Sequence, residues 1–117
     1  MPIIRRGQLP ADVDGGVRRQ FIATAAVGTA SLTVMEVTMA PGASLPLHIH
    51  PGHEECIIIQ QGTFSWVLGD QKGTVGAGNT IIAPSGVKHS LANVGSRPAK
   101  LLAIFPTTNV KREAVSS

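Results

Sequence analysis

The chain has 117 residues, the length of a single domain built around one core. Hydrophobic residues make up 43% of it and charged residues 15%, without a low-complexity run, and this composition excludes an intrinsically disordered protein. The formal charge of +3 comes from scattered Lys and Arg residues, and aromatic residues are only 3%, which argues against a nucleic-acid partner.

Cysteine usage and the length of the apolar runs indicate the compartment. Cys56 is the single cysteine, so an internal disulfide cannot form, and this fits a reducing cytoplasm. No apolar run approaches the roughly 20 residues of a membrane span, and no apolar stretch of signal-peptide length follows the N-terminus. We therefore expect a soluble cytoplasmic protein with no membrane partner.

Glycine and proline interrupt the chain at short, fairly even intervals. The thirteen glycines and eight prolines leave apolar pieces of strand length, and helical spacing of apolar residues is not sustained anywhere. The predicted strands, in chain order, are Val17–Thr24, Ala30–Ala40, Leu45–His50, Glu55–Gln61, Thr63–Leu68, Gln71–Val75, Thr80–Ala83, His89–Asn93 and Ala99–Pro106.

Regular short strands separated by turn residues predict an all-β fold, and a double-sheet jelly roll suits eight or nine strands in this length. We expect residues 1–117 to form one domain. Residues 1–16 would be an N-terminal arm or edge strand, and the tail 109–117 would fray. Because an edge strand needs covering, we also expect a homodimer.

The segment 41–62, PGASLPLHIHPGHEECIIIQQG, concentrates the groups that can bind a metal. Side chains alternate along a strand, so His48 and His50 point to one face and two imidazoles can converge. Pro51-Gly52 then turns the chain, and Glu55 begins the next strand, where a carboxylate can lie beside the two rings. A third imidazole would complete a His/carboxylate set that suits iron, manganese, nickel, copper or zinc.

The segment 78–93, GNTIIAPSGVKHSLAN, supplies that imidazole as His89. Together the two segments resemble both signatures of the cupin superfamily. The first, G-x5-H-x-H-x4-E-x6-G, falls on Gly42, His48, His50, Glu55 and Gly62. The second, G-x5-P-x-G-x2-H-x3-N, falls on Gly78, Pro84, Gly86, His89 and Asn93. Fifteen residues separate Gly62 from Gly78, which resembles the short loop between the motifs of compact bacterial cupins.

The resemblance implies a double-stranded β-helix, the jelly-roll cupin barrel, with an open mouth for a small-molecule substrate. It also implies one divalent transition metal, iron or manganese before nickel, copper or zinc. The implied metal ligands are His48, His50, Glu55 and His89. Such a set leaves coordination positions for water or substrate, as catalytic sites do.

Glu54 and Glu55 compete for the carboxylate position. Counting six residues back from Gly62 selects Glu55, and its four-residue interval from His50 resembles the germin branch of the family. Cys56 would then face away from the metal, and Ile57 would share the inward face with Glu55. Glu54 stays a candidate for a ligand or proton-transfer role, and a solvent-facing neighbour is the plainer alternative.

His53 lies in the predicted turn between the ligand strands. We name His53 and Glu54 as catalytic candidates, because either could transfer protons near the metal. An exposed loop histidine without a function is an equally good interpretation of His53.

Three functions fit this site. The leading hypothesis is a metal-dependent oxygenase or oxidase, a dioxygenase-like oxidoreductase that acts on a small organic substrate. The second is a redox-neutral isomerase, lyase or cyclase in which the metal acts as a Lewis acid. The third is a non-enzymatic module that binds a metal or small ligand, because a fold supports many functions.

Overall fold

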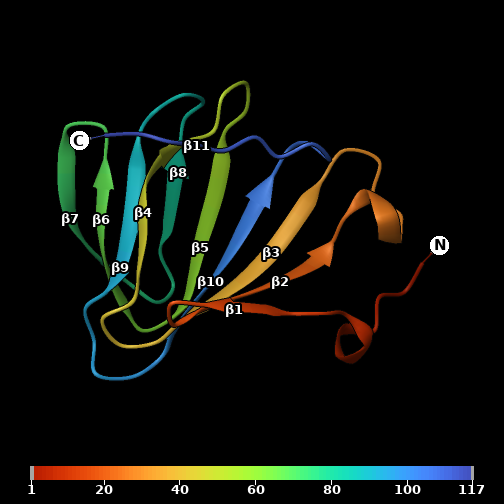
Figure 1. The fold of residues 1–117 in the computed structure, drawn as a ribbon, viewed down its shortest axis with the longest axis horizontal. Helices are drawn as coiled ribbons and strands as arrows, with labels where there is room; N and C mark the ends of the chain where they lie inside the picture. The colour runs from red at the N-terminus through yellow and green to blue at the C-terminus, as the bar shows by residue number, and fades with distance from the viewer. Residues whose placement is uncertain (1, 117) are drawn as a thin grey trace.

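The computed structural model describes residues 2–116 and consists of two antiparallel β-sheets packed face to face (Figure 1). One sheet has six strands in the order β1-β2-β3-β10-β5-β8, and the other has five in the order β11-β4-β9-β6-β7. Because consecutive strands alternate between the sheets over much of the chain, this is the predicted all-β jelly roll. Within residues 2–116 no helix has the length and apolarity that crossing a membrane demands.

Eleven strands and two short 3-10 helices make up the fold. The strands are β1 (Asp12–Asp14), β2 (Val17–Ala23), β3 (Thr33–Met39), β4 (Ser44–Ile49), β5 (Glu55–Gln61), β6 (Thr63–Leu68), β7 (Gln71–Gly76), β8 (Thr80–Ala83), β9 (His89–Asn93), β10 (Ala99–Phe105) and β11 (Glu113–Ala114). The helices are η1 (Arg6–Gln8) and η2 (Ala25–Val27).

All nine predicted strands are present, most of them within one residue of the expected ends. The largest difference is at β3, which begins at Thr33 and not at Ala30. The chain first makes the helical turn η2 and ends it at Gly28, whose φ of 116° is open to glycine and strained for other residues. The N-terminal arm contains the edge strand β1, which pairs with β2.

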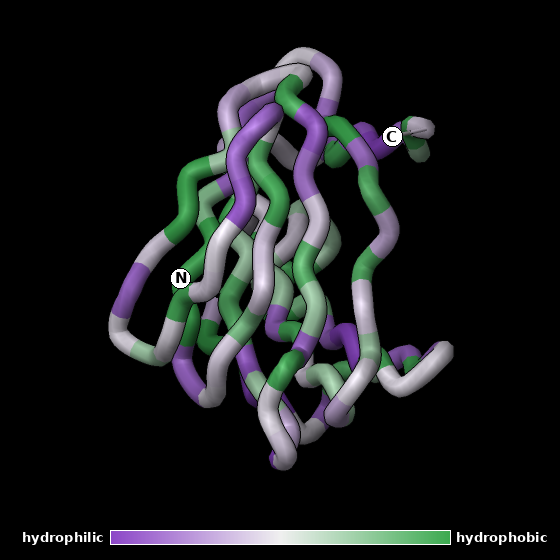
Figure 2. The backbone as a smooth tube through the Cα atoms, turned by 90° about the vertical axis from the view of Figure 1, so that its left-hand side faces the viewer, coloured by the Kyte–Doolittle hydropathy of each residue, from purple (hydrophilic) through white to green (hydrophobic). Residues whose placement is uncertain are grey.

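The core lies between the two sheets and is formed by alternate residues of their strands. In β10 the side chains of Ala99, Leu101, Ala103 and Phe105 are buried and those between them are less so. Figure 2 shows the same alternation as green stretches that interrupt paler and purple ones along the strands. The period of two is what a sheet with one buried face requires.

The C-terminal segment links the two sheets across one end of the sandwich. After β10 the chain crosses this end and adds β11 to the five-stranded sheet, where Glu113 pairs with Ile49 and Ala114 with His48 (Figure 1). The tail 109–117, which we expected to fray, thus contains a short strand whose main chain forms ladder hydrogen bonds with the edge of β4. The strand is two residues long and exposed, so no hydrophobic pattern could predict it.

Candidate metal centre

The predicted ligands come together at the same end of the sandwich, and they come from both sheets. His48 in β4 and His89 at the start of β9 are directly paired in the five-stranded sheet, and His50 follows the end of β4. Glu55 begins β5 in the six-stranded sheet and faces the three rings across the interior. All four side chains are buried. The turn at Pro51-Gly52 thus carries the chain from one sheet to the other and sets the carboxylate opposite the imidazoles.

Backbone carbonyl groups orient all three imidazoles in the same way. Nδ1 of His48 donates to the oxygen of Pro46 at 2.7 Å, and Nδ1 of His89 donates to the oxygen of Val87 at 3.0 Å. Nδ1 of His50 donates to the oxygen of Lys111 at 2.6 Å. A carbonyl oxygen can only accept, so each Nδ1 carries a proton, and Nε2 is the ring nitrogen of each histidine that is left to bind a metal. Metal-binding histidines are held by contacts of this kind.

The four ligand atoms gather around one point. One atom from each of His48, His50, Glu55 and His89 lies within 4.8 Å of the other three. Oε1 of Glu55 is 3.0 Å from Nε2 of His89 and 3.1 Å from Nε2 of His50. Within residues 2–116, Nε2 of His50 is buried and has no hydrogen-bond partner of acceptable geometry. Three ring nitrogens and one carboxylate oxygen form a donor set that fits a divalent transition metal.

The protonation states of His48 and Glu55 also suit a metal. Burial lowers the pKa of His48 to about 4 and outweighs the hydrogen bond to Pro46, so the ring is neutral near pH 7. Burial alone would raise the pKa of Glu55, but the contacts with His50 and His89 outweigh it and lower the pKa to about 2. The carboxylate is therefore ionised, and it raises the pKa of His50 against the opposing effect of burial.

The structure separates the two glutamates clearly. Glu55 is buried among the imidazoles, whereas Glu54 precedes the strand and is exposed. Cys56 also faces away from the ligands, as expected, and Ile57 shares the inward face with Glu55. The count from Gly62 thus selected the glutamate that the fold brings to the imidazoles.

His53 lies beside the ligands but does not line the cavity. Its ring centroid is 5.3 Å from that of His50, and its Nδ1 donates to the oxygen of Glu54 at 3.1 Å. Its Nε2 accepts a hydrogen bond from the backbone N–H of Lys111 at 3.1 Å. Both ring nitrogens are thereby engaged with the main chain, so His53 joins the turn to the C-terminal segment. Neither His53 nor Glu54 is among the cavity residues.

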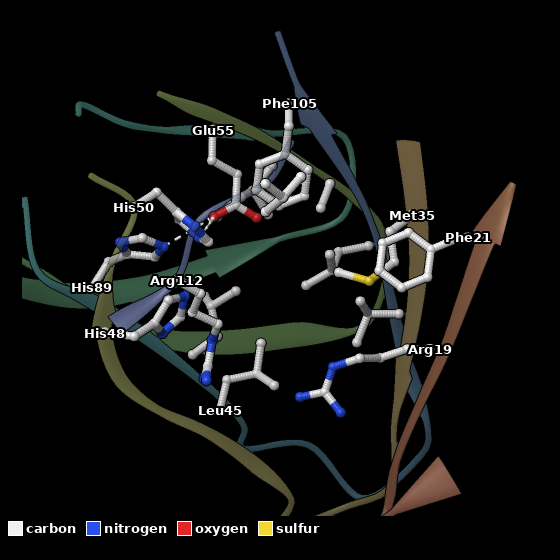
Figure 3. Close-up of a pocket in the computed structure, with 16 residues that line it drawn as sticks. Arg19, Phe21, Met35, Leu45, His48, His50, Glu55, His89, Phe105 and Arg112 are labelled. Carbon is white, nitrogen blue, oxygen red and sulfur yellow. Dashed lines mark hydrogen bonds and ion pairs between the residues drawn. The ribbon is translucent and has the colours of Figure 1, made fainter. Parts of the chain in front are cut away.

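A cavity of about 150 Å³ extends from the ligands into the interior of the sandwich. Figure 3 shows the three histidines and Glu55 on one side of it, with Phe21 and Met35 on the opposite side. The walls are mainly apolar, from Phe21, Met35, Val37, Leu45, Ile57, Leu91, Leu101, Ala103, Phe105 and Val110. This space suits a small organic molecule with an apolar part.

Sequence reasoning missed two cavity residues, Arg19 and Arg112. Arg19 follows the period of two that puts Val17 and Phe21 on the inner face of β2, and this parity was a usable signal. Arg112 lies in a segment without a strand pattern, and only the fold brings it to the cavity. The same is true of Lys111, which acts through its main chain, since a backbone carbonyl has no signature in a sequence.

Comparison with known proteins agrees with this architecture. Residues 35–105, more than half of the chain, match the Cupin_2 family, a cupin domain, so the chain belongs to the cupins. A germin-like protein from Morus alba is 36% identical over 76 residues, which are 61% of this chain and 36% of that protein. The chain therefore spans little more than a third of the length of this relative.

Two solved structures illustrate the similarity of the fold. The polyketide cyclase RemF from Streptomyces resistomycificus superposes with a TM-score of 0.85 at 22% identity, covering 100% of this chain and 87% of that chain. A structure of an oxalate oxidase superposes with a TM-score of 0.78 at 25% identity, covering 88% of this chain and 57% of that chain. The expected cupin jelly roll is confirmed.

Proposed function

We propose that this protein is a metal-dependent oxidoreductase of the oxidase or oxygenase type that acts on a small organic molecule. The observation that carries the proposal is a set of three oriented imidazoles and one carboxylate at the end of a largely apolar cavity. His48, His50, Glu55 and His89 would hold one divalent ion. Bound iron or manganese supplies open coordination positions and one-electron chemistry with dioxygen.

The other residues of the cavity support redox chemistry over proton transfer. An isomerase, lyase or cyclase needs a side chain that gives or takes a proton at the substrate. Apart from the four candidate ligands, the titratable side chains that line the cavity are Arg19 and Arg112, and arginine stays protonated. His53 and Glu54, the candidates for proton transfer, lie outside it. What this chain contributes is the orientation of the ligands and an apolar wall that excludes water.

The names of the relatives point to two classes of reaction: the oxalate oxidase supports the oxidase type, and the polyketide cyclase RemF, at 22% identity, matches the cyclase alternative. Among the solved structures, the oxalate oxidase is 25% identical to this chain, and its name describes an oxidase. The germin-like protein matches 76 residues of this chain at a higher identity of 36%. The chain covers only part of each, so the substrate has to be found by experiment.

The test compares one protein loaded with different metals. Metal-free protein is reconstituted with Fe(II), Mn(II) or Zn(II), metal content is measured by mass spectrometry, and oxygen uptake is followed with a panel of small carboxylic acids, hydroxy acids and phenols. We expect about one metal per chain and oxygen uptake with iron or manganese but not zinc. The His50→Ala variant should bind no stoichiometric metal and consume no oxygen.

Other outcomes decide between the remaining functions. Product formation with zinc and without oxygen uptake would replace the oxidoreductase by a redox-neutral isomerase, lyase or cyclase. Failure to bind any metal after reconstitution would contradict the proposal and leave a barrel that binds a small ligand.

A further inference from the structure

The cavity contains two positive charges that the metal centre does not use. Arg19 enters from β2 in the six-stranded sheet, and Arg112 enters from the C-terminal segment just before β11 in the five-stranded sheet. In Figure 3 Arg112 lies beside His48 and Arg19 lies below Met35 and Phe21, with Leu45 between the two arginines. They are close enough to affect each other, since Arg19 lowers the pKa of Arg112, after the larger effect of burial.

No protein carboxylate forms an ion pair with either arginine in the part of the chain that is described, although the charge of Glu55 acts on Arg112 and opposes the lowering of its pKa by burial and by Arg19. Across residues 2–116 the ion pairs of the structure involve Arg6, His50 and His89, and neither cavity arginine takes part in one. Glu55 is the sole acidic residue in the lining, and it is already in contact with His50 and His89. Arg19 is half-buried and Arg112 is exposed, and both line the cavity. Like charges that line one cavity repel each other, and a bound anion would offset that repulsion.

The rest of the wall limits the kind of anion. Besides the arginine pair and the ligands, the cavity is lined by Phe21, Met35, Leu45, Phe105 and their apolar neighbours. A fully polar anion would leave these apolar surfaces in contact with water or with polar atoms of the anion. Neither kind of contact stabilises the complex, because apolar surface is stabilised by contact with other apolar groups. A ligand with a charged end and an apolar body can satisfy both parts of the cavity.

We infer that the ligand of this cavity is a small organic carboxylate whose charged group pairs with Arg19 and Arg112 and whose apolar body lies against Phe21, Met35 and Phe105. Guanidinium groups bind carboxylates through paired N–H donors, so a planar carboxylate suits them better than a neutral polar group does. That such a carboxylate is also the substrate rests on the proposed oxidoreductase function. The binding of the carboxylate does not rest on that function, because neither arginine belongs to the metal centre.

The experiment uses matched acids and amides on the full chain. Binding of propanoate, hexanoate and phenylacetate, and of the corresponding neutral amides, is measured by isothermal titration calorimetry on metal-free protein and again on manganese-loaded protein. We expect at least one acid to bind metal-free protein about tenfold or more tightly than its amide, the difference that one or two charged hydrogen bonds supply. Arg19→Gln and Arg112→Gln should each remove most of that preference and leave amide binding unchanged.

Arg18→Gln is the matched control. Arg18 is the neighbour of Arg19 in β2 but lies on the opposite face of the strand and is not in the cavity, so its loss should leave the preference for acids intact. Thermal melts of the three variants establish that each is folded. A preference that Arg18→Gln reduces as much as Arg19→Gln would reflect overall charge and contradict the inference.

Three further results would overturn the inference. They are equal binding of acid and amide, acid binding that both arginine variants leave unchanged, and binding of no acid below 10 mM. Acid binding that requires manganese and ignores the arginines would move the carboxylate to the metal and leave the oxidoreductase proposal in place. Arginine-dependent binding without oxygen uptake would support the carboxylate site and contradict the oxidoreductase proposal.

Discussion

The backbone of Lys111 lies between two histidines, with its carbonyl oxygen 2.6 Å from Nδ1 of His50 and its N–H group 3.1 Å from Nε2 of His53. The first contact fixes which nitrogen His50 presents to the candidate metal. The second holds the segment against the turn that joins the ligand strands. A residue 61 positions after His50 therefore completes the support of that ring, and the C-terminal segment is part of the metal centre.

Removing this segment should weaken metal binding without unfolding the protein. A chain that ends at Thr108 loses the carbonyl that orients His50 and the strand β11 beside His48, while the main core residues are retained. Loss of such supporting contacts typically lowers metal affinity about 10- to 100-fold. Competition with a chromophoric zinc chelator measures the change. A chain that ends at Val115 is the control, and equal affinity of the two truncated chains would contradict the supporting role.

The two adjacent glutamates should behave very differently when replaced. Glu55→Ala removes the one carboxylate in the ligand group, so we expect it to lower metal affinity at least as much as the truncation does. Glu54 is exposed, and Glu54→Ala should change the affinity by less than a factor of two. The same chelator competition compares the two variants. The reverse ranking would mean that the turn at Pro51-Gly52 places the other carboxylate at the metal.

Gly62, the last residue of the first motif, should be required for close packing as well as for its backbone conformation. Its φ is 84°, and a Cβ atom there would lie 2.7 Å from Cβ of Ala99, which is fully buried. Gly42 has a similar φ of 81°, but a Cβ on it would meet nothing within 4 Å. Both Ala substitutions impose left-handed strain of about 1–2 kcal/mol, and only Gly62→Ala adds a steric clash.

Urea denaturation of the two glycine variants separates these effects. We expect Gly62→Ala to lower the free energy of unfolding by at least 1 kcal/mol more than Gly42→Ala, as overpacking typically does. Equal losses would show that Ala99 moves aside and that Gly62 serves the backbone conformation alone.

The sequence predicted those parts of the site that have a local pattern. The period of two placed His48 and His50 on one face, and the motif spacing selected Glu55 and His89. The edge strand β1 was expected only as an unspecified part of residues 1–16, and β11 was missed, because they are three and two residues long and exposed, and nothing in their composition separates them from loops.

The other missed contributions depend on tertiary structure. Lys111 acts through a backbone carbonyl, and any residue type at that position would offer one. Arg112 reaches the cavity because β11 pairs with β4 and draws the preceding residues across the end of the sandwich. Arg19 lies on the same face of its strand as Val17 and Phe21, as the period of two predicts. A charged residue in that position is nevertheless expected to face solvent, and only the fold shows that this face borders the cavity.

An ion pair far from the metal centre should make stability depend on pH. Arg6, in the N-terminal arm, pairs with the buried carboxylate of Glu36 in β3 and also donates to Gln20. The hydrogen bond from Arg6 lowers the pKa of Glu36 below its usual value of 4.5, against the effect of burial, and the charges of Lys100 and Arg18 add to the shift. In the unfolded chain this interaction is lost, so the carboxyl group binds a proton at higher pH than it does in the folded protein.

The lowered pKa determines the sign of the effect. The stabilisation by ionised Glu36 is fully present above about pH 5, and it is lost as the pH falls through the unfolded value of about 4.5 toward the lower folded value. The melting temperature of the wild type should therefore exceed that of Glu36→Gln at pH 7, and the difference should shrink steadily between pH 5 and pH 3. Glu54→Gln, at an exposed site, is the control and should show no such trend. A difference between wild type and Glu36→Gln that stays constant over this range would mean that Arg6 does not hold the carboxylate in the folded protein in solution.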